Sequence, residues 1–153
     1  MTRHHQSWIW NRTSAMVAVL ASALVFATAW RAADAVDKVT GLPLHPGLEV
    51  QQEVNSPVCG HPAHIVLYDT PGTATLAEYL SWYRSQLKGA HYVHKVWSNR
   101  AQEMFYSADG ATGVSLTANT SGPGVYSVAY MKISTPLSTK QMDAFEPSNP
   151  QCK

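Results

Sequence analysis

Histidines are the side chains in this sequence that are best suited to chemistry, and two pairs of them have the spacing His-x-x-His. His91 and His94 fall in a run expected to be a strand, where residues three apart point to opposite faces. His61 and His64 lie where a loop is expected to join a strand, so both imidazoles could converge on a metal ion. The sequence therefore makes His61 and His64 the candidate metal ligands. The alternative is surface imidazoles whose charge changes with pH.

Motifs of the common hydrolases are missing from the chain. It contains neither Gly-x-Ser-x-Gly nor His-Glu-x-x-His. The glycine-containing segments 110–113 and 122–124 are each expected to join two strands, which favours turns over phosphate-binding loops. A dispersed catalytic triad stays open, because such sites are spatial and need no fixed spacing. No catalytic residue and no cofactor is predicted.

Aromatic side chains give a second candidate site, on strands expected to be neighbours. Packing in the core and pairing across strands are the ordinary roles of such residues. The functional alternative is an aromatic-lined face that binds a sugar, a peptide or an apolar ligand. The candidate residues for that face are Trp97, Tyr106, Tyr126 and Tyr130.

Residues 1–35 have the form of a secretory signal peptide, with Arg3 and Arg12 before an apolar run and small residues before Ala29 and Ala35. The run, residues 15–30, is shorter than the roughly 18 to 20 residues that span a bilayer. Cleavage after Ala29 or Ala35 is therefore expected. An uncleaved anchor that tethers the domain to the membrane is the alternative. The expected location is the periplasm or the medium.

The net charge of the chain limits the kinds of partner that the protein is expected to bind. Three of the eleven basic residues and one of the ten acidic residues lie in residues 1–35, so the remainder is nearly neutral. Nucleic-acid binding draws most of its affinity from Lys and Arg contacts to phosphates. The sequence therefore argues against a nucleic-acid partner and leaves an unknown ligand or protein as the expected partner. Contact with a membrane is expected only if residues 1–35 are retained.

Two cysteines, Cys59 and Cys152, follow the predicted signal peptide. Because an exported chain meets an oxidising compartment, a disulfide between them is the simplest prediction. It would hold the C-terminal tail near the start of the domain. Free thiols, an intermolecular bridge and a redox pair are the alternatives, and the absence of Cys-x-x-Cys spacing disfavours the last.

A helix is predicted over residues 73–89, and the other elements must form around it. Its apolar residues recur at steps of three and four, which gives one apolar stripe. Thr75 and Glu78 have the form of a capping box, and Gly89 is placed to end the helix in a left-handed conformation. The stripe consists of Leu76, Tyr79, Leu80, Tyr83 and Leu87.

Short alternating runs elsewhere predict strands, with a short helix over residues 139–145. Tight turns between these runs require antiparallel pairing. The predicted fold is therefore a single α+β domain, residues 36–153, with an antiparallel sheet of five to six strands, one main helix on one face, two layers and a C-terminal tail. The predicted strands are 48–54, 64–68, 91–97, 103–106, 113–118 and 125–133.

Two short motifs resemble those of small exported bacterial domains of unknown function. One is Leu42-Pro43-Leu44-His45-Pro46-Gly47, and the other is Trp82-Tyr83 with the later Leu87. This resemblance implies an exported α+β domain and implies no activity, cofactor or catalytic residue. The function expected from the sequence is thus an exported, non-enzymatic domain that binds a ligand or a protein. A metal-dependent or hydrolytic enzyme using the region of His61 and His64 is the alternative.

Overall fold

A computed structural model describes residues 35–120, 124–146 and 152 of the chain. Residues 1–34 form one unit and residues 35–153 another. The predicted signal peptide therefore lies outside the described residues, except for Ala35. In the part of the chain that is described, none of the helices has the length and apolar character needed to cross a membrane.

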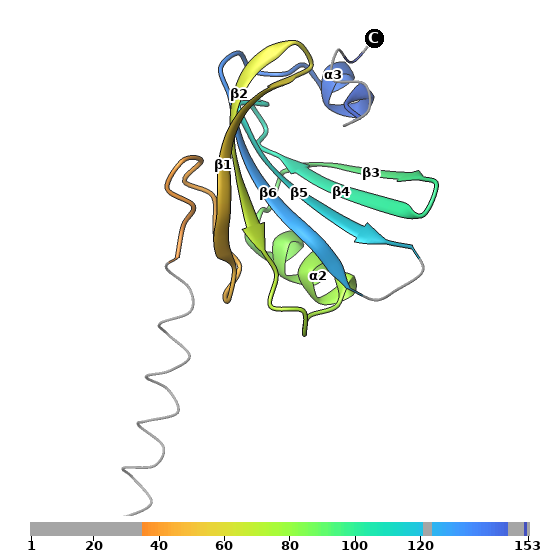
Figure 1. Cartoon of the computed structure of the whole chain (residues 1–153). Helices are drawn as coiled ribbons and strands as arrows, with labels where there is room; N and C mark the ends of the chain where they lie inside the picture. The colour runs from red at the N-terminus through yellow and green to blue at the C-terminus, as the bar shows by residue number, and fades with distance from the viewer. Residues whose placement is uncertain (1–34, 121–123, 147–151, 153) are drawn as a thin grey trace, which may run out of the picture. The chain divides into compact units, whose positions relative to one another are not determined.

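One antiparallel sheet organises the domain (Figure 1). Its six strands lie in the order β1-β2-β6-β5-β4-β3, so the last strand is inserted between β2 and β5. This confirms the predicted antiparallel sheet, at the upper end of the predicted strand number. The strands are β1 (Glu49–Val58), β2 (His61–Asp69), β3 (His91–Trp97), β4 (Arg100–Tyr106), β5 (Thr112–Asn119) and β6 (Val125–Ile133).

The main helix is α2 (Leu76–Gln86), and its N-terminal signals are confirmed. Thr75 is the N-cap, and the reciprocal capping box with Glu78 is present. Gly89 has φ +82°, so it supplies the left-handed residue that lets the chain leave the helix. The helix is shorter than residues 73–89 because these cap positions lie outside its hydrogen-bonded turns.

Each face of the sheet carries its own hydrophobic core. On the first face, Tyr79 and Tyr83 of α2 are fully buried against sheet residues such as Phe105 and Val114. We name this cluster the α2-side core. On the opposite face, the short helix α3 (Thr139–Ala144) covers part of the sheet through Met142. We name that cluster the α3-side core; it consists of Val58, Cys59, Ala63, Val93, Met104, Tyr106, Met131, Ile133, Leu137, Met142 and Phe145.

The β1–β2 hairpin is longer than predicted, because residues 55–62 were expected to be a loop. The structure instead has a turn of two residues, Cys59 and Gly60, with φ +52° and +78°. Positive φ at both turn residues matches the twist of the flanking strands, so pairing continues to the turn. Pro57 pairs with Pro62, and Pro57 is tolerated because β1 is an edge strand.

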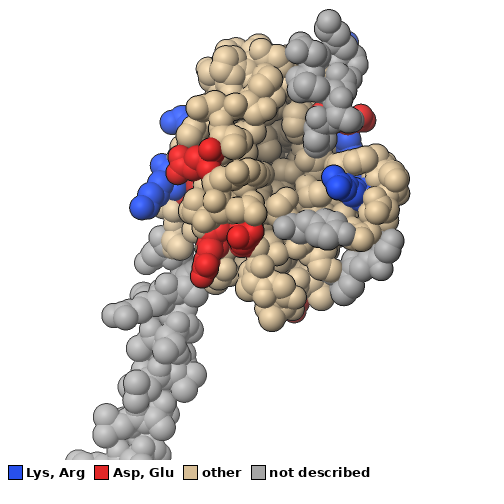
Figure 2. Space-filling view, viewed as in Figure 1, with Lys and Arg blue, Asp and Glu red and all other residues tan. Residues whose placement is uncertain are grey.

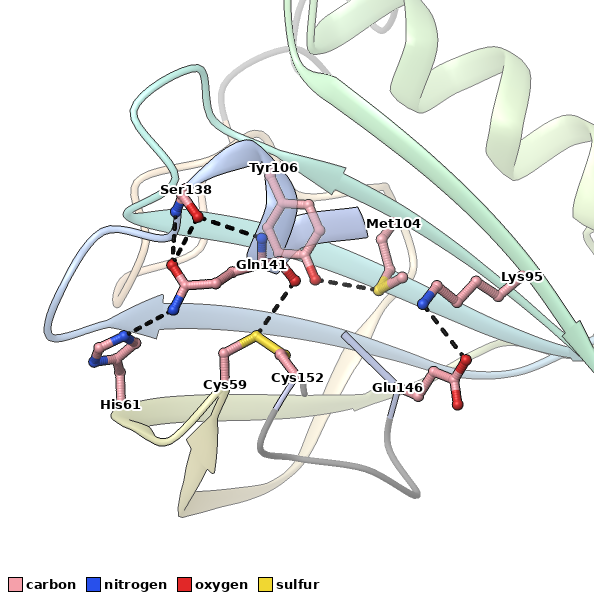
Figure 3. The surroundings of a disulfide bond; sticks show 9 residues. All are labelled: Cys59, His61, Lys95, Met104, Tyr106, Ser138, Gln141, Glu146 and Cys152. Atoms are coloured by element: carbon pink, nitrogen blue, oxygen red, sulfur yellow. Dashed lines mark hydrogen bonds and ion pairs between the residues drawn. A yellow bond between two sulfur atoms is a disulfide. The ribbon is translucent and has the colours of Figure 1, made fainter. Parts of the chain in front are cut away.

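The predicted disulfide between Cys59 and Cys152 is present and joins the hairpin turn to the tail (Figure 3). The Cys59 Sγ also lies 3.4 Å from the Gln141 carbonyl oxygen of α3. In Figure 1 the hairpin arches toward α3. The bond therefore fastens the tail to the hairpin turn, next to α3.

Candidate functional site

His61 and His64 do not converge in the structure. Both lie on β2, and residues three apart on a strand point to opposite faces. His61 Nε2 lies 3.2 Å from Gln141 Nε2 on the α3 side (Figure 3). His64 instead contacts two side chains of β1, described below. The junction expected from the sequence is a continuous strand, so the two imidazoles cannot share one metal ion.

The His64 ring is held between two oxygen atoms of β1. Its Nδ1 lies 2.9 Å from Asn55 Oδ1, and its Nε2 lies 3.0 Å from Glu53 Oε2. Both ring nitrogens of His64 are therefore in contact with side chains of β1.

An open groove of about 620 Å³ lies beside His64, along the turn end of the β1–β2 hairpin and the end of β6. We name it the β2 groove, because β2 forms its floor between β1 and β6. Ser134 continues the sheet beyond β6, since its N–H donates to the Pro62 carbonyl at 2.9 Å. The lining residues are Asn55, Ser56, Pro57, Gly60, Pro62, Ala63, His64, Lys132, Ile133 and Ser134.

Lys132 brings a positive charge to the β2 groove. In the sheet register it stands directly opposite His64 of β2 on one side and Thr112 of β5 on the other. Directly opposed residues on antiparallel strands project to the same face. Strand alternation places Lys132 on the face of Tyr130, two residues earlier. The groove therefore lies on the same face as α2, beyond the residues that α2 covers.

A second polar cluster surrounds Glu103, whose side chain is only 4% exposed. One carboxylate oxygen accepts a hydrogen bond from the Tyr92 hydroxyl, and the other lies 2.8 Å from His94 Nδ1. The guanidinium of Arg84 lies 5.0 Å from the centre of the Tyr92 ring. Because a carboxylate can only accept, it selects the Nδ1–H form of His94 and leaves Nε2 toward solvent. Sequence analysis missed this cluster, since only the β3–β4 register brings its members together.

The four predicted aromatic residues do not form one face. Tyr106 lies in the α3-side core, and Tyr130 lies in the α2-side core on the opposite face. Both are fully buried. Trp97 is half-buried at the end of β3, and the side chain of Tyr126 lies outside what the structure describes. Tyr106 and Tyr130 therefore act in packing rather than in lining a ligand face.

Buried tyrosines instead hold the segment before β1, residues 35–48, against the sheet. We name these residues the entry segment. The Tyr68 hydroxyl donates to the carboxylate of Asp37 at 2.6 Å, and Asp37 is itself buried. Thr40 donates to the other oxygen of that carboxylate through its N–H at 2.7 Å and its hydroxyl at 2.6 Å. Burial, together with the Asp37 carboxylate, raises the pKa of Tyr68. Asp37 is thus a satisfied structural anion.

Clusters of three or more His, Cys, Asp or Glu side chains able to hold a metal ion do not occur among residues 35–120, 124–146 and 152. On the face shown in Figure 2 the charged side chains form small groups with uncharged surface between the groups.

Comparison with known proteins adds no template for this arrangement. No family model, no curated protein and no solved structure matches the chain.

Proposed function

We propose that this protein is an exported, non-enzymatic domain that binds a ligand in the β2 groove. The observation that carries the proposal is the groove itself, an opening of about 620 Å³ whose wall includes the exposed residues Lys132 and Ser134. Ligand sites in proteins commonly measure about 300–1,000 Å³ and combine apolar walls with a few polar groups. The β2 groove has both, since Pro57 and Pro62 line it together with His64 and Lys132.

Export to the periplasm or the medium is part of this proposal. It is supported by the disulfide between Cys59 and Cys152, because such bonds persist in oxidising compartments. It is also supported by the signal-peptide form of residues 1–35. The resemblance to small exported domains and the two-layer α+β class belong to the same proposal, with the sheet and α2 as the two layers and α3 as a cap.

The enzyme alternative has less support. His64 has both ring nitrogens engaged by Asn55 and Glu53. A general base needs a free nitrogen within hydrogen-bond reach of the proton that it removes. His94 contacts Glu103 through Nδ1 and does not line the β2 groove. Binding without chemistry is therefore the better supported function.

A fragment screen by NMR tests the proposal. The full chain is expressed in an exporting bacterium and purified in the form that the cell produces. Small-molecule fragments are then added to the ¹⁵N-labelled protein. We expect a common set of hits to shift the amide signals of Asn55, His64 and Ser134. Hits that map only to other surfaces, or a screen without hits, would overturn the proposal.

A further inference from the structure

The charge inside the β2 groove points to the kind of ligand that it takes. Among the described residues, the ion pairs within 4.0 Å join His64 to Glu53, His91 to Asp143, His94 to Glu103 and Lys95 to Glu146. Lys132 takes part in none of them. Glu53 of the neighbouring strand β1 lies against His64. Lys132 is therefore a cation in the groove wall that has no carboxylate partner within residues 35–120, 124–146 and 152.

From this arrangement we infer that the β2 groove binds a small molecule that carries a carboxylate on an apolar body, with the carboxylate against Lys132. The inference rests on the proposed function and adds the chemical class of the ligand. An ammonium group makes stronger hydrogen bonds to an ionised acceptor than to a neutral one. A carboxylate would supply the partner that Lys132 lacks.

A neutral donor beside Lys132 fits the same class of ligand. Ser134 lies two residues after Lys132 on the same face. Its hydroxyl can donate to the second oxygen of a carboxylate. His64 contributes the surface of its ring rather than a donor, because Asn55 and Glu53 hold both of its nitrogens.

The rest of the wall is apolar and suits the remainder of the ligand. On the face of Lys132 it is formed by two prolines of the hairpin, Pro57 and Pro62. Proline rings are rigid, so little conformational freedom is lost when a ligand packs against them. An aromatic or aliphatic body would bury apolar surface here while its carboxylate stays at Lys132.

Benzoate and benzamide provide a matched pair of probes, since they share a ring and differ in charge. Each is titrated into the full-length ¹⁵N-labelled protein as the cell produces it, and Kd is taken from the shifts of groove amides. We expect benzoate to bind about tenfold more tightly than benzamide. The preference should disappear in Lys132→Met, which removes the charge and keeps most of the side-chain length. It should persist in the control Lys140→Met, because Lys140 is an exposed residue of α3 outside the groove.

The outcomes separate this inference from the proposed function. If fragments bind in the groove but benzoate shows no preference over benzamide, the carboxylate inference is overturned and the binding function stands. A preference for benzoate that survives in Lys132→Met also overturns the carboxylate inference, because another residue would then bind the carboxylate. If the fragment screen finds no groove ligand, the function fails and the inference fails with it.

Discussion

The hydroxyl groups of Tyr83 and Tyr130 lie 2.8 Å apart inside the α2-side core. Tyr130 in turn donates to the Pro43 carbonyl at 2.7 Å. A single chain of hydrogen bonds thus links α2, β6 and the entry segment. Pro43 and Tyr83, which belong to the two short motifs of the sequence, are therefore joined through Tyr130.

Buried tyrosines should make the protein sensitive to alkali. Burial raises the pKa of Tyr83, Tyr106 and Tyr130 in the folded state, whereas unfolded tyrosines titrate near pH 10. Their contribution to stability is therefore complete below about pH 10 and is lost as the pH rises beyond it. Each such tyrosine should add about 1.4 kcal/mol per pH unit to the loss.

Urea unfolding between pH 8 and pH 11 measures this dependence. Above pH 10 the free energy of unfolding of Tyr83→Phe should fall less steeply with pH than that of the unsubstituted protein. The difference should be about the contribution of one tyrosine, because Tyr130 keeps its hydrogen bond to Pro43. A free energy of unfolding that stays constant across pH 10 would contradict the assignment of these tyrosines as buried.

Loss of the disulfide should weaken the whole domain rather than only its tail. The bond spans 93 residues, and closing a long loop restricts the unfolded chain, for which about 2–4 kcal/mol is typical. The double variant Cys59→Ser, Cys152→Ser should therefore unfold at lower urea concentration. The unsubstituted protein in reducing agent is the control and should move to the same midpoint. An unchanged midpoint in both would show that the bond does not constrain the unfolded chain.

Replacing Gly110 by a residue with a side chain should destabilise the protein through steric overlap as well as backbone strain. Gly72 is the control that separates the two effects. Gly110 has φ +71°, and an added Cβ would overlap the Leu137 carbonyl oxygen. Gly72 has the same φ of +71° with no atom within 4 Å of an added Cβ. Gly72→Ala should therefore cost only the left-handed strain, about 1–2 kcal/mol.

Gly110→Ala adds a steric overlap to that strain and should cost about 1–3 kcal/mol more. The displaced segment would also strain the hydrogen bond from Leu137 N–H to the Gly110 carbonyl, at 3.0 Å. Thermal or urea unfolding of both variants gives the difference. Equal losses would mean that the approach of residue 137 to this turn is not as close as described.

The Glu103 cluster predicts an unusual state for one histidine. ¹⁵N NMR should show a proton on Nδ1 of the His94 ring, because the buried Glu103 carboxylate accepts a hydrogen bond from it. In Glu103→Ala this preference should be lost, while the His45 ring, which lies among α2 aromatics instead, should be unchanged. A His94 ring that carries its proton on Nε2 alone in the unsubstituted protein would contradict the geometry.

The spacing of apolar residues predicted well the strands and helices that bury only one face. β3 and β6 occupy the predicted residues, 91–97 and 125–133, and α3 begins at its predicted first residue, Thr139. The errors lie at the hairpin, where residues 55–62 pair in the sheet although two prolines suggested a loop. The missing signal was the turn at Cys59 and Gly60, because cysteine gives no indication of a left-handed conformation.

The candidate site was less predictable, since it depends on register. Spacing alone drew attention to His61 and His64, yet strand geometry separates them. Lys132 could have been placed on the face of Tyr130 by alternation along β6. Its position opposite His64 required the β2–β6 pairing, which joins strands far apart in the chain. Short sequence patterns carry no information on such pairing.

Blocking the β2 groove provides the most direct measurement of the central claim. Ser134 is an exposed residue of the groove wall, so Ser134→Trp should fill the opening without disturbing either core. Ser81→Trp places the same side chain on the exposed side of α2, away from the groove. For the tightest ligand from the fragment screen, the account predicts Kd at least about tenfold weaker in Ser134→Trp and unchanged in Ser81→Trp. Equal affinity in the two variants would contradict a ligand site in this groove.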